Sequence, residues 1–357
     1  MKSMRHLRLL LVFLPTLALQ AWDYEGHRIV NRLGLASLPK DFPAFVHEAQ
    51  AAERIAFLAG EPDRWRNVDP WLRQPGASWT DHFLDVEQLD WAGLDARTVP
   101  SLRLDFAQAF AAGRAAHADR FPVIDPAKNT DGVRQWPGFA PWAITEWTHK
   151  LRSAFACLKA FEEMGGTPEE IRNARENAIY AMGILGHYVG DCAQPLHTTE
   201  HYNGWTGPNP EGYTTWRGMH SWSDSGFVNK AGIHYDGLKS RVKSAAPKPL
   251  GPRPDGRDPI FVAVMDWFLE QHAQVEVLYR LEKEGKLNNE QEKLVRDQQF
   301  PGPVSDEGRA LFEGQLLRGG SMLASLWATA WQSAPVDTYL RGQLARRAAS
   351  AKPRANP

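Results

Sequence analysis

Apolar residues recur at steps of three and four through seven long segments of the chain, the spacing that places them on one face of an α-helix. No stretch of similar length alternates apolar and polar residues in the manner of a half-buried strand. With 357 residues, 43% of them hydrophobic, the chain can bury a large core. We therefore predict an all-α fold, a single mostly helical domain with long loops that carry the site. The helical segments are residues 29–38, 45–58, 102–116, 142–161, 171–189, 260–281 and 310–331, and the long loops are residues 61–89, 122–141, 201–218 and 245–259.

The first 21 residues have the pattern of a secretory signal peptide. Lys2, Arg5 and Arg8 precede an apolar run at residues 9–19, and Ala21 offers a small residue at the cut. The run is shorter than the roughly 20 residues that a membrane-spanning helix needs. We therefore expect a secreted or periplasmic protein whose mature chain begins at the next residue.

We predict that the mature chain forms one domain, residues 22–345. The Pro-rich segment 245–259 is interpreted as an insertion, because the helical pattern resumes after it. Residues 346–357 lack large apolar side chains, which predicts a disordered tail. The formal net charge of -1 gives no overall positive field, so a polyanion would have to be bound locally.

Histidine and aspartate recur at helical spacing. His187 and Asp191 are four residues apart in a strongly helical segment, so both side chains project from one face and can meet a single cation. His197 follows, and His220 and Asp224 repeat the four-residue spacing. One such pair is typical of a surface hydrogen bond, but two pairs with a histidine between them indicate a metal site.

The chain has only two cysteines, Cys157 and Cys192, so a cysteine-only metal cluster is excluded. The sequence leaves open whether these two residues form a disulfide or remain packed thiols.

Three further candidates, His27, Asp63 and His82, lie upstream. Together with the two pairs they resemble the trinuclear-zinc hydrolases, the superfamily of fungal and plant single-strand-specific nucleases and bacterial zinc-dependent phospholipases C. The resemblance covers residues 22–224, with a weaker echo at residues 310–326. Its most specific parts are the spacing His187-x3-Asp191-x5-His197 and the pair His220-x3-Asp224, which begins 23 residues after His197.

The resemblance implies three Zn²⁺ ions in one cleft of a helical fold. The first ion would be held by Asp63, His82, His187 and Asp191, and the second by His197, His220 and Asp224. The third would be held by the α-amino group and carbonyl of Trp22 together with His27, and would share Asp191. Removal of the signal peptide would create the amine ligand, since only a free amine can bind zinc.

The implied reaction is hydrolysis of a phosphodiester by metal-activated hydroxide. The catalytic residues would be Asp63 and Asp191, through the ions they hold, and Arg66, which would stabilise the negative charge that develops on phosphorus. Phe83 and Asp85 match positions that form a base pocket in the nuclease branch, where a ring stacks on the base and a carboxylate meets its edge.

We therefore expect a zinc-dependent nuclease that cleaves single-stranded nucleic acid, with no stable protein partner. A zinc-dependent phospholipase C and a non-catalytic zinc-binding exported protein are the alternatives. Aromatic residues of the loop at 201–218 and just after it could stack bases, enclose a choline head group or pack the loop; they are Trp205, Tyr213, Trp216 and Trp222.

Overall fold

The computed structural model describes residue 22, residues 24–287 and residues 303–351. In these ranges the chain forms α-helices, short 3-10 and π turns and two isolated bridges, with no β-strand. The predicted all-α fold is therefore confirmed. None of the helices in the same ranges combines the length and the apolar character needed to cross a bilayer. The predicted signal peptide lies outside the described residues.

Most helices fall where the apolar spacing predicts them, with two differences. The segment at 260–281 forms two helices rather than one, and the expected loop at 61–89 contains α3 and α4. The α-helices are α1 (Tyr24–Ala36), α2 (Ala49–Leu58), α3 (Glu61–Val68), α4 (Val86–Trp91), α5 (Arg103–Ala116), α6 (Ala140–Met164), α7 (Pro168–Ala193), α8 (Met219–Ser221), α9 (Phe227–Ala231), α10 (Tyr235–Leu238), α11 (Pro259–His272), α12 (Gln274–Lys283), α14 (Asp306–Gln332) and α15 (Thr338–Ala351).

Helix α3 was missed because it is short and polar and has no apolar stripe. Its start nevertheless has a physical cause. Pro62 lies in the first turn, where its fixed φ suits a helix and its missing N–H costs nothing. Glu61 and Asp63 place negative charge at the positive end of the helix dipole.

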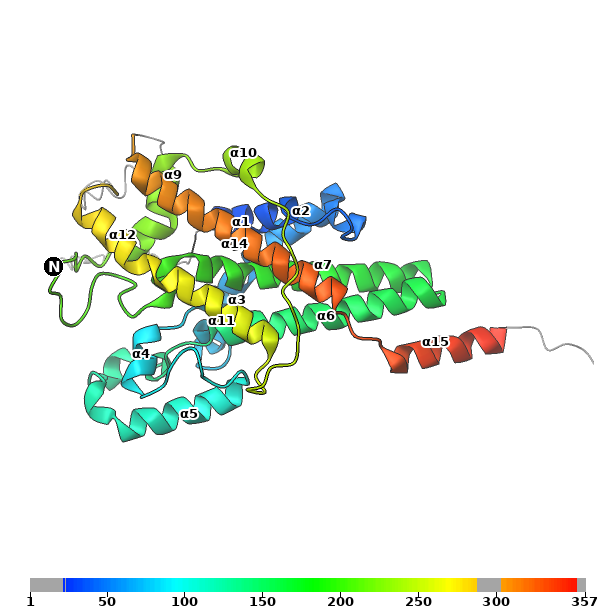
Figure 1. The fold of residues 1–357 in the computed structure, drawn as a ribbon, viewed down its shortest axis with the longest axis horizontal. Coiled ribbons are helices and arrows are strands. Elements are labelled where there is room, and N and C mark those ends of the chain that lie inside the picture. The colour runs from blue at the N-terminus through cyan, green and yellow to red at the C-terminus, as the bar shows by residue number, and fades with distance from the viewer. Residues whose placement is uncertain (1–21, 23, 288–302, 352–357) are drawn as a thin grey trace, which may run out of the picture.

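Helix α7 is the centre of the fold. It runs beside α6 (Figure 1) and also packs against α1, α2 and α14. A capping box between Thr167 and Glu170 fixes its start. Every residue from 181 to 193 is buried, so this end of α7 is surrounded by protein on all sides. Polar side chains on it must therefore find partners in the interior.

The Pro-rich segment 245–259 crosses the surface in extended form and leads into α11 (Figure 1). It is tied to the end of α1 and to α14, because Ala245 N–H donates to Ser37 O and Lys248 N–H donates to Thr329 Oγ1. The segment is therefore part of the surface of the domain.

The expected disordered tail is wrong for residues 346–351, which form the last turns of α15. Alanine and arginine dominate this segment and favour a helix without any large apolar residue. Arg347 also pairs with Glu170 at 2.8 Å, which ties α15 to the start of α7. Residues 352–357 of the predicted tail lie outside the described ranges.

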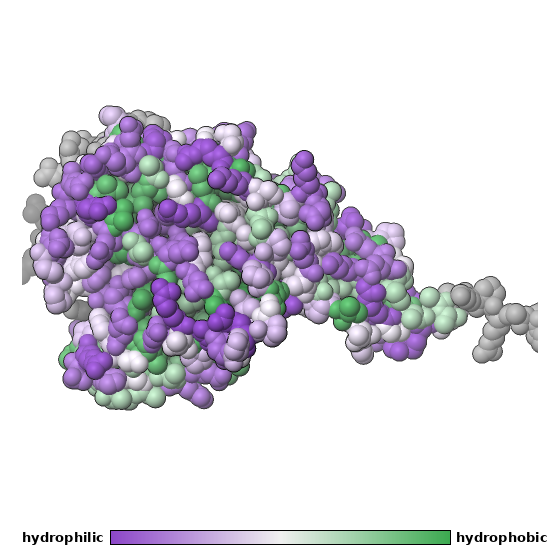
Figure 2. All heavy atoms as spheres, in the orientation of Figure 1, coloured by the Kyte–Doolittle hydropathy of each residue, from purple (hydrophilic) through white to green (hydrophobic). Residues whose placement is uncertain are grey.

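The face in Figure 2 is mostly hydrophilic, and its hydrophobic residues form small separate groups. This is the surface expected of a helical domain whose apolar stripes point inward.

Candidate metal centre

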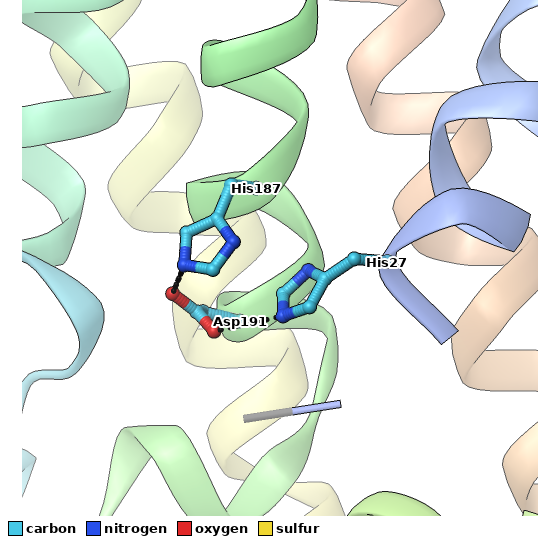
Figure 3. Close-up of side chains that lie close together, drawn as sticks. All are labelled: His27, His187 and Asp191. Atoms are coloured by element: carbon cyan, nitrogen blue, oxygen red, sulfur yellow. Dashed lines mark ion pairs between the residues drawn. The ribbon is translucent and has the colours of Figure 1, made fainter. Parts of the chain in front are cut away.

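Asp191 lies at the meeting point of two helices. It extends from α7 toward His187, one turn earlier on the same helix, and His27 reaches it from α1 (Figure 3). His187 Nε2 is 3.2 Å from Asp191 Oδ2, and His27 Nε2 is 3.5 Å from Oδ1. The two imidazole rings stack with their centroids 4.2 Å apart. All three side chains are fully buried, and together they form one group that can hold a metal ion.

A second group adds residues from the segment that was expected to be a loop. Asp63 projects from α3, and His82 ends the 3-10 turn η3 (Trp79–His82). His82 Nδ1 lies 2.9 Å from His187 Nε2, 3.0 Å from Asp191 Oδ2 and 3.9 Å from Asp63 Oδ1. Asp63, His82 and His187 can therefore hold an ion beside the first group.

The third group lies on the cleft side of Asp191. His197 lies in the 3-10 turn η7 (Pro195–Thr198), His220 in α8, and Asp224 in the π-helical turn η8 (Trp222–Gly226). His220 Nε2 is 3.0 Å from His197 Nε2 and 2.8 Å from Asp224 Oδ2. The π turn inserts one residue into the helix, as often occurs at functional sites. These three residues form a further group that can hold a metal ion.

Hydrogen bonds to carbonyl groups fix the tautomers of two histidines. A carbonyl can only accept, so Nδ1–H of His187 donates to Ala59 O at 2.7 Å, and Nδ1–H of His197 donates to His82 O at 2.8 Å. In the neutral rings each Nε2 then presents a lone pair to its group. Such outer hydrogen bonds are what orient histidines that bind metals.

Several buried polar atoms have no hydrogen-bond partner among the described residues. They include both ring nitrogens of His27, Oδ1 of Asp191 and Nδ1 of His220. Leaving such atoms unsatisfied costs free energy, which a bound cation would offset. The residues therefore fit divalent metal ions that take nitrogen and oxygen ligands, as Zn²⁺ does.

The protonation states suit the same purpose. Burial, with a contribution from nearby His187, lowers the pKa of His27 to about 3, and burial together with Arg66 lowers the pKa of His82 to about 4. Burial raises the pKa of Asp191, but His187 and His82 outweigh it and hold that pKa well below its usual value. At neutral pH, His27 and His82 are thus neutral imidazoles next to the ionised carboxylate of Asp191, the forms in which these groups bind metals.

The electrostatic surroundings of His187 also favour a positive charge. Burial lowers its pKa, but Asp191 and Asp63 overcome this effect, so the pKa of His187 is raised. In the absence of a metal ion, a proton on the His187 ring is stabilised by the carboxylates of Asp191 and Asp63.

Gly190 makes room for His27. A Cβ atom at this position of α7 would lie 2.6 Å from His27 Nδ1, which is closer than a Cβ atom approaches its neighbours. Only glycine lets the imidazole from α1 lie against α7 beside Asp191.

Arg66 is a buried residue of the site. Its Nε donates to Asp63 Oδ1 at 2.7 Å, and its guanidinium lies over the Trp79 ring, 4.6 Å from the centroid. It also lines a cleft with a volume of about 640 Å³ that opens beside the metal groups. A positive charge is thus held next to the candidate metal centre.

The same cleft brings the predicted base-pocket residues to the metal groups. Phe83 and Asp85 line it together with His82, His197 and His220. Burial, then Glu87 and Glu200, raise the pKa of Asp85 well above its usual value. An aromatic ring and a carboxyl group thus line the same cleft as the candidate ligands.

Trp22, two residues before the start of α1, is buried, and its ring meets Phe312 edge to face, with the centroids 6.0 Å apart. Residues 21 and 23 lie outside the described ranges, so the role of its backbone amine as a ligand stays a prediction. Cys157 and Cys192 are both free thiols, which resolves the alternatives that the sequence left open.

The aromatic residues around the 201–218 loop pack the protein. Trp205 stacks on His201, with centroids 3.8 Å apart, and contacts Tyr213, while Trp222 is buried and donates to Leu287 O. None of Trp205, Tyr213, Trp216 and Trp222 lines the cleft.

Sequence reasoning missed Gln194 and Tyr202. The Gln194 side chain donates to Asp224 and accepts from Leu196 N–H, so it positions the aspartate of the third group. The position of Gln194 between the predicted ligands Asp191 and His197 could have indicated this role. Tyr202 lines the cleft and meets His220 edge to face, with ring centroids 5.5 Å apart.

Neither a scan of protein-family models nor a search of curated proteins finds a match to this chain. What the chain does must therefore be argued from the site itself.

Proposed function

We propose that this protein is a zinc-dependent phosphodiesterase that cleaves single-stranded nucleic acid. The observation that carries the proposal is the convergence of three buried His/Asp groups around Asp191, beside a cleft that also contains Arg66 and Phe83. Spacings in the sequence that resemble the trinuclear-zinc nucleases support the same function.

The ligands of each ion are assigned as the resemblance implies, and the three groups support this assignment. His27 and Asp191, joined by the Trp22 amine and carbonyl, would hold one ion, and Asp63, His82, His187 and Asp191 a second. His197, His220 and Asp224 would hold a third. Divalent ions in such a site lower the pKa of bound water to roughly 7 and neutralise charge on phosphoryl oxygens.

The remaining residues bind and orient the substrate. Arg66 faces the cleft from beside Asp63, so its guanidinium can donate to a phosphoryl oxygen as negative charge grows there. Phe83 offers a ring on which a base can stack, and Asp85 offers a carboxyl group to the base edge. Unpaired bases have free faces, which favours a single strand over a duplex.

The test combines metal analysis with hydrolysis assays on the mature protein. We expect close to three zinc ions per chain, and hydrolysis of single-stranded DNA and of bis(p-nitrophenyl) phosphate that stops with chelator and returns with zinc. Asp191→Asn should lose more than one ion and nearly all activity, because this carboxylate faces two of the groups.

Asp266→Asn is the matched control, since Asp266 is exposed on α11 and lies outside the cleft. A single tightly bound ion that survives Asp191→Asn would defeat the proposed metal centre. Cleavage of phosphatidylcholine without cleavage of DNA would assign the site to a phospholipase C, and metal binding without any hydrolysis would make it a non-catalytic zinc protein.

A further inference from the structure

A second pocket borders the cleft beside the metal groups. The pocket has a volume of about 480 Å³, lies under residues 121–136 and is lined by Phe110, Ala115, Gln135 and their neighbours. It shares Arg114, Phe121 and Trp136 with the cleft that reaches the histidines. Because the two share these residues, the outer pocket lies directly beside the cleft of the candidate metal centre. Each part has the volume of a typical small-ligand site.

Arg114 is the charged group at the junction. It is half-buried on α5, and its guanidinium lies over the Phe121 ring, 4.2 Å from the centroid. No carboxylate among the described residues comes within ion-pair distance of it. Arginine held on an aromatic ring and without an acidic partner is suited to bind a phosphate.

Two acidic residues of the loop that line the cleft accept hydrogen bonds within turns of that loop. Asp125 accepts from Ala127 N–H and Asp131 from Val133 N–H, both through side-chain oxygens. Apart from Arg114 and Gln135, the residues that line the pocket are aromatic or apolar. Phe110 and Trp136 lie with ring centroids 6.3 Å apart, and Phe121 packs against Phe110.

We propose that the outer pocket binds a nucleotide of the single strand that lies beyond the scissile phosphate, with its phosphate on Arg114 and its base against Trp136. The inference rests on the proposed nuclease function and extends it to a longer substrate. An acyl chain fits this pocket less well, because it would cover the guanidinium without supplying an opposite charge.

A binding site of this kind makes the enzyme sensitive to substrate length. A dinucleotide would occupy the metal centre and stack on Phe83. A longer strand would also reach Arg114. The Michaelis constant should therefore fall from a dinucleotide to a dodecanucleotide.

The experiment compares Arg114→Gln with Arg120→Gln, a matched control on the same segment that is exposed and lines neither pocket. Ala115→Glu is a second variant, since this exposed residue lines the outer pocket and the new charge would repel phosphate. Substrates are a dodecathymidylate, a dithymidine monophosphate, bis(p-nitrophenyl) phosphate and phosphatidylcholine. Binding of the dodecamer is also measured by fluorescence anisotropy in chelator.

For Arg114→Gln we expect the Michaelis constant on the dodecamer, relative to that on bis(p-nitrophenyl) phosphate, to rise about tenfold, the loss of one charged hydrogen bond. The slope of log affinity against log salt should become shallower by roughly 0.7. Ala115→Glu should act in the same direction, and Arg120→Gln should not.

Equal changes on the dodecamer, the dinucleotide and bis(p-nitrophenyl) phosphate, or no change on any substrate, would overturn the inference. If the parent protein hydrolyses no phosphodiester but Arg114→Gln weakens its binding of the dodecamer, the nucleotide-binding role of the pocket stands and the proposed catalysis is overturned. An Arg114→Gln effect confined to hydrolysis of phosphatidylcholine would show that the pocket binds a lipid, and would overturn the proposal that it binds a nucleotide.

Discussion

Gly190→Ala adds one methyl group at the contact between α7 and α1, and it tests whether the centre depends on that contact. The new Cβ would lie 2.6 Å from His27 Nδ1, while ordinary contact begins at 3.4 Å, so the two helices must separate or His27 must move. His27 has little freedom to move, because it is fully buried and stacked on His187. Overpacking of this kind costs about 1 to 3 kcal/mol.

Against this cost, replacing glycine by alanine inside a helix gains about 0.8 to 1.0 kcal/mol. The free energy of unfolding should therefore fall by about 0 to 2 kcal/mol, measured by urea denaturation in chelator. The zinc content, measured by mass spectrometry, should fall by one ion, because His27 no longer meets Asp191.

Gly314→Ala is the matched control. Gly314 lies inside α14, and a Cβ there would meet nothing within 4 Å. This variant should gain up to about 1 kcal/mol and keep its metal. If Gly190→Ala gains as much as Gly314→Ala and keeps every ion, the steric argument is refuted.

Two further predictions concern the walls of the cleft. Phe83→Ala should raise the Michaelis constant on single-stranded DNA roughly 5- to 150-fold, the equivalent of about 1 to 3 kcal/mol of stacking, with little change on bis(p-nitrophenyl) phosphate; equal losses on both substrates would mean a structural ring. Burial and Glu87 raise the pKa of Glu200 from 4.5 to about 7, so between these pH values the folded protein holds a proton that the unfolded chain releases, and stability falls as the pH rises. Glu200→Gln should remove this slope and be more stable relative to the parent at pH 8 than at pH 5, by denaturation in chelator; a constant difference between the two proteins would contradict the assignment.

The sequence carried the predictions that depend on local spacing. His187 and Asp191 meet because four residues are one helical turn, and the apolar positions around them predicted the buried helix that holds them. His220 and Asp224 meet for the same reason, although the π turn between Trp222 and Gly226 was not foreseen.

Contacts between distant segments could not be predicted in this way. The fit of His27 against Gly190 joins residues more than 160 positions apart, and nothing in either local sequence specifies it. Helix α3 escaped because periodicity detects apolar stripes and this helix has none. The outer pocket at Arg114 depends on how the loop after α5 folds back, which spacing does not determine.

The depth of burial sets an order in which ions would exchange with solvent. His27, His187 and Asp191 are 0% exposed, whereas His197 and His220 are 5% and 8% exposed and border the cleft. An ion held by the outer residues can be reached directly by a chelator. An ion held by the inner residues can leave only when α1 and α7 part locally, so its release rate reaches a plateau that more chelator cannot raise. Slow metal loss from this protein would thus report the opening rate of its helical core.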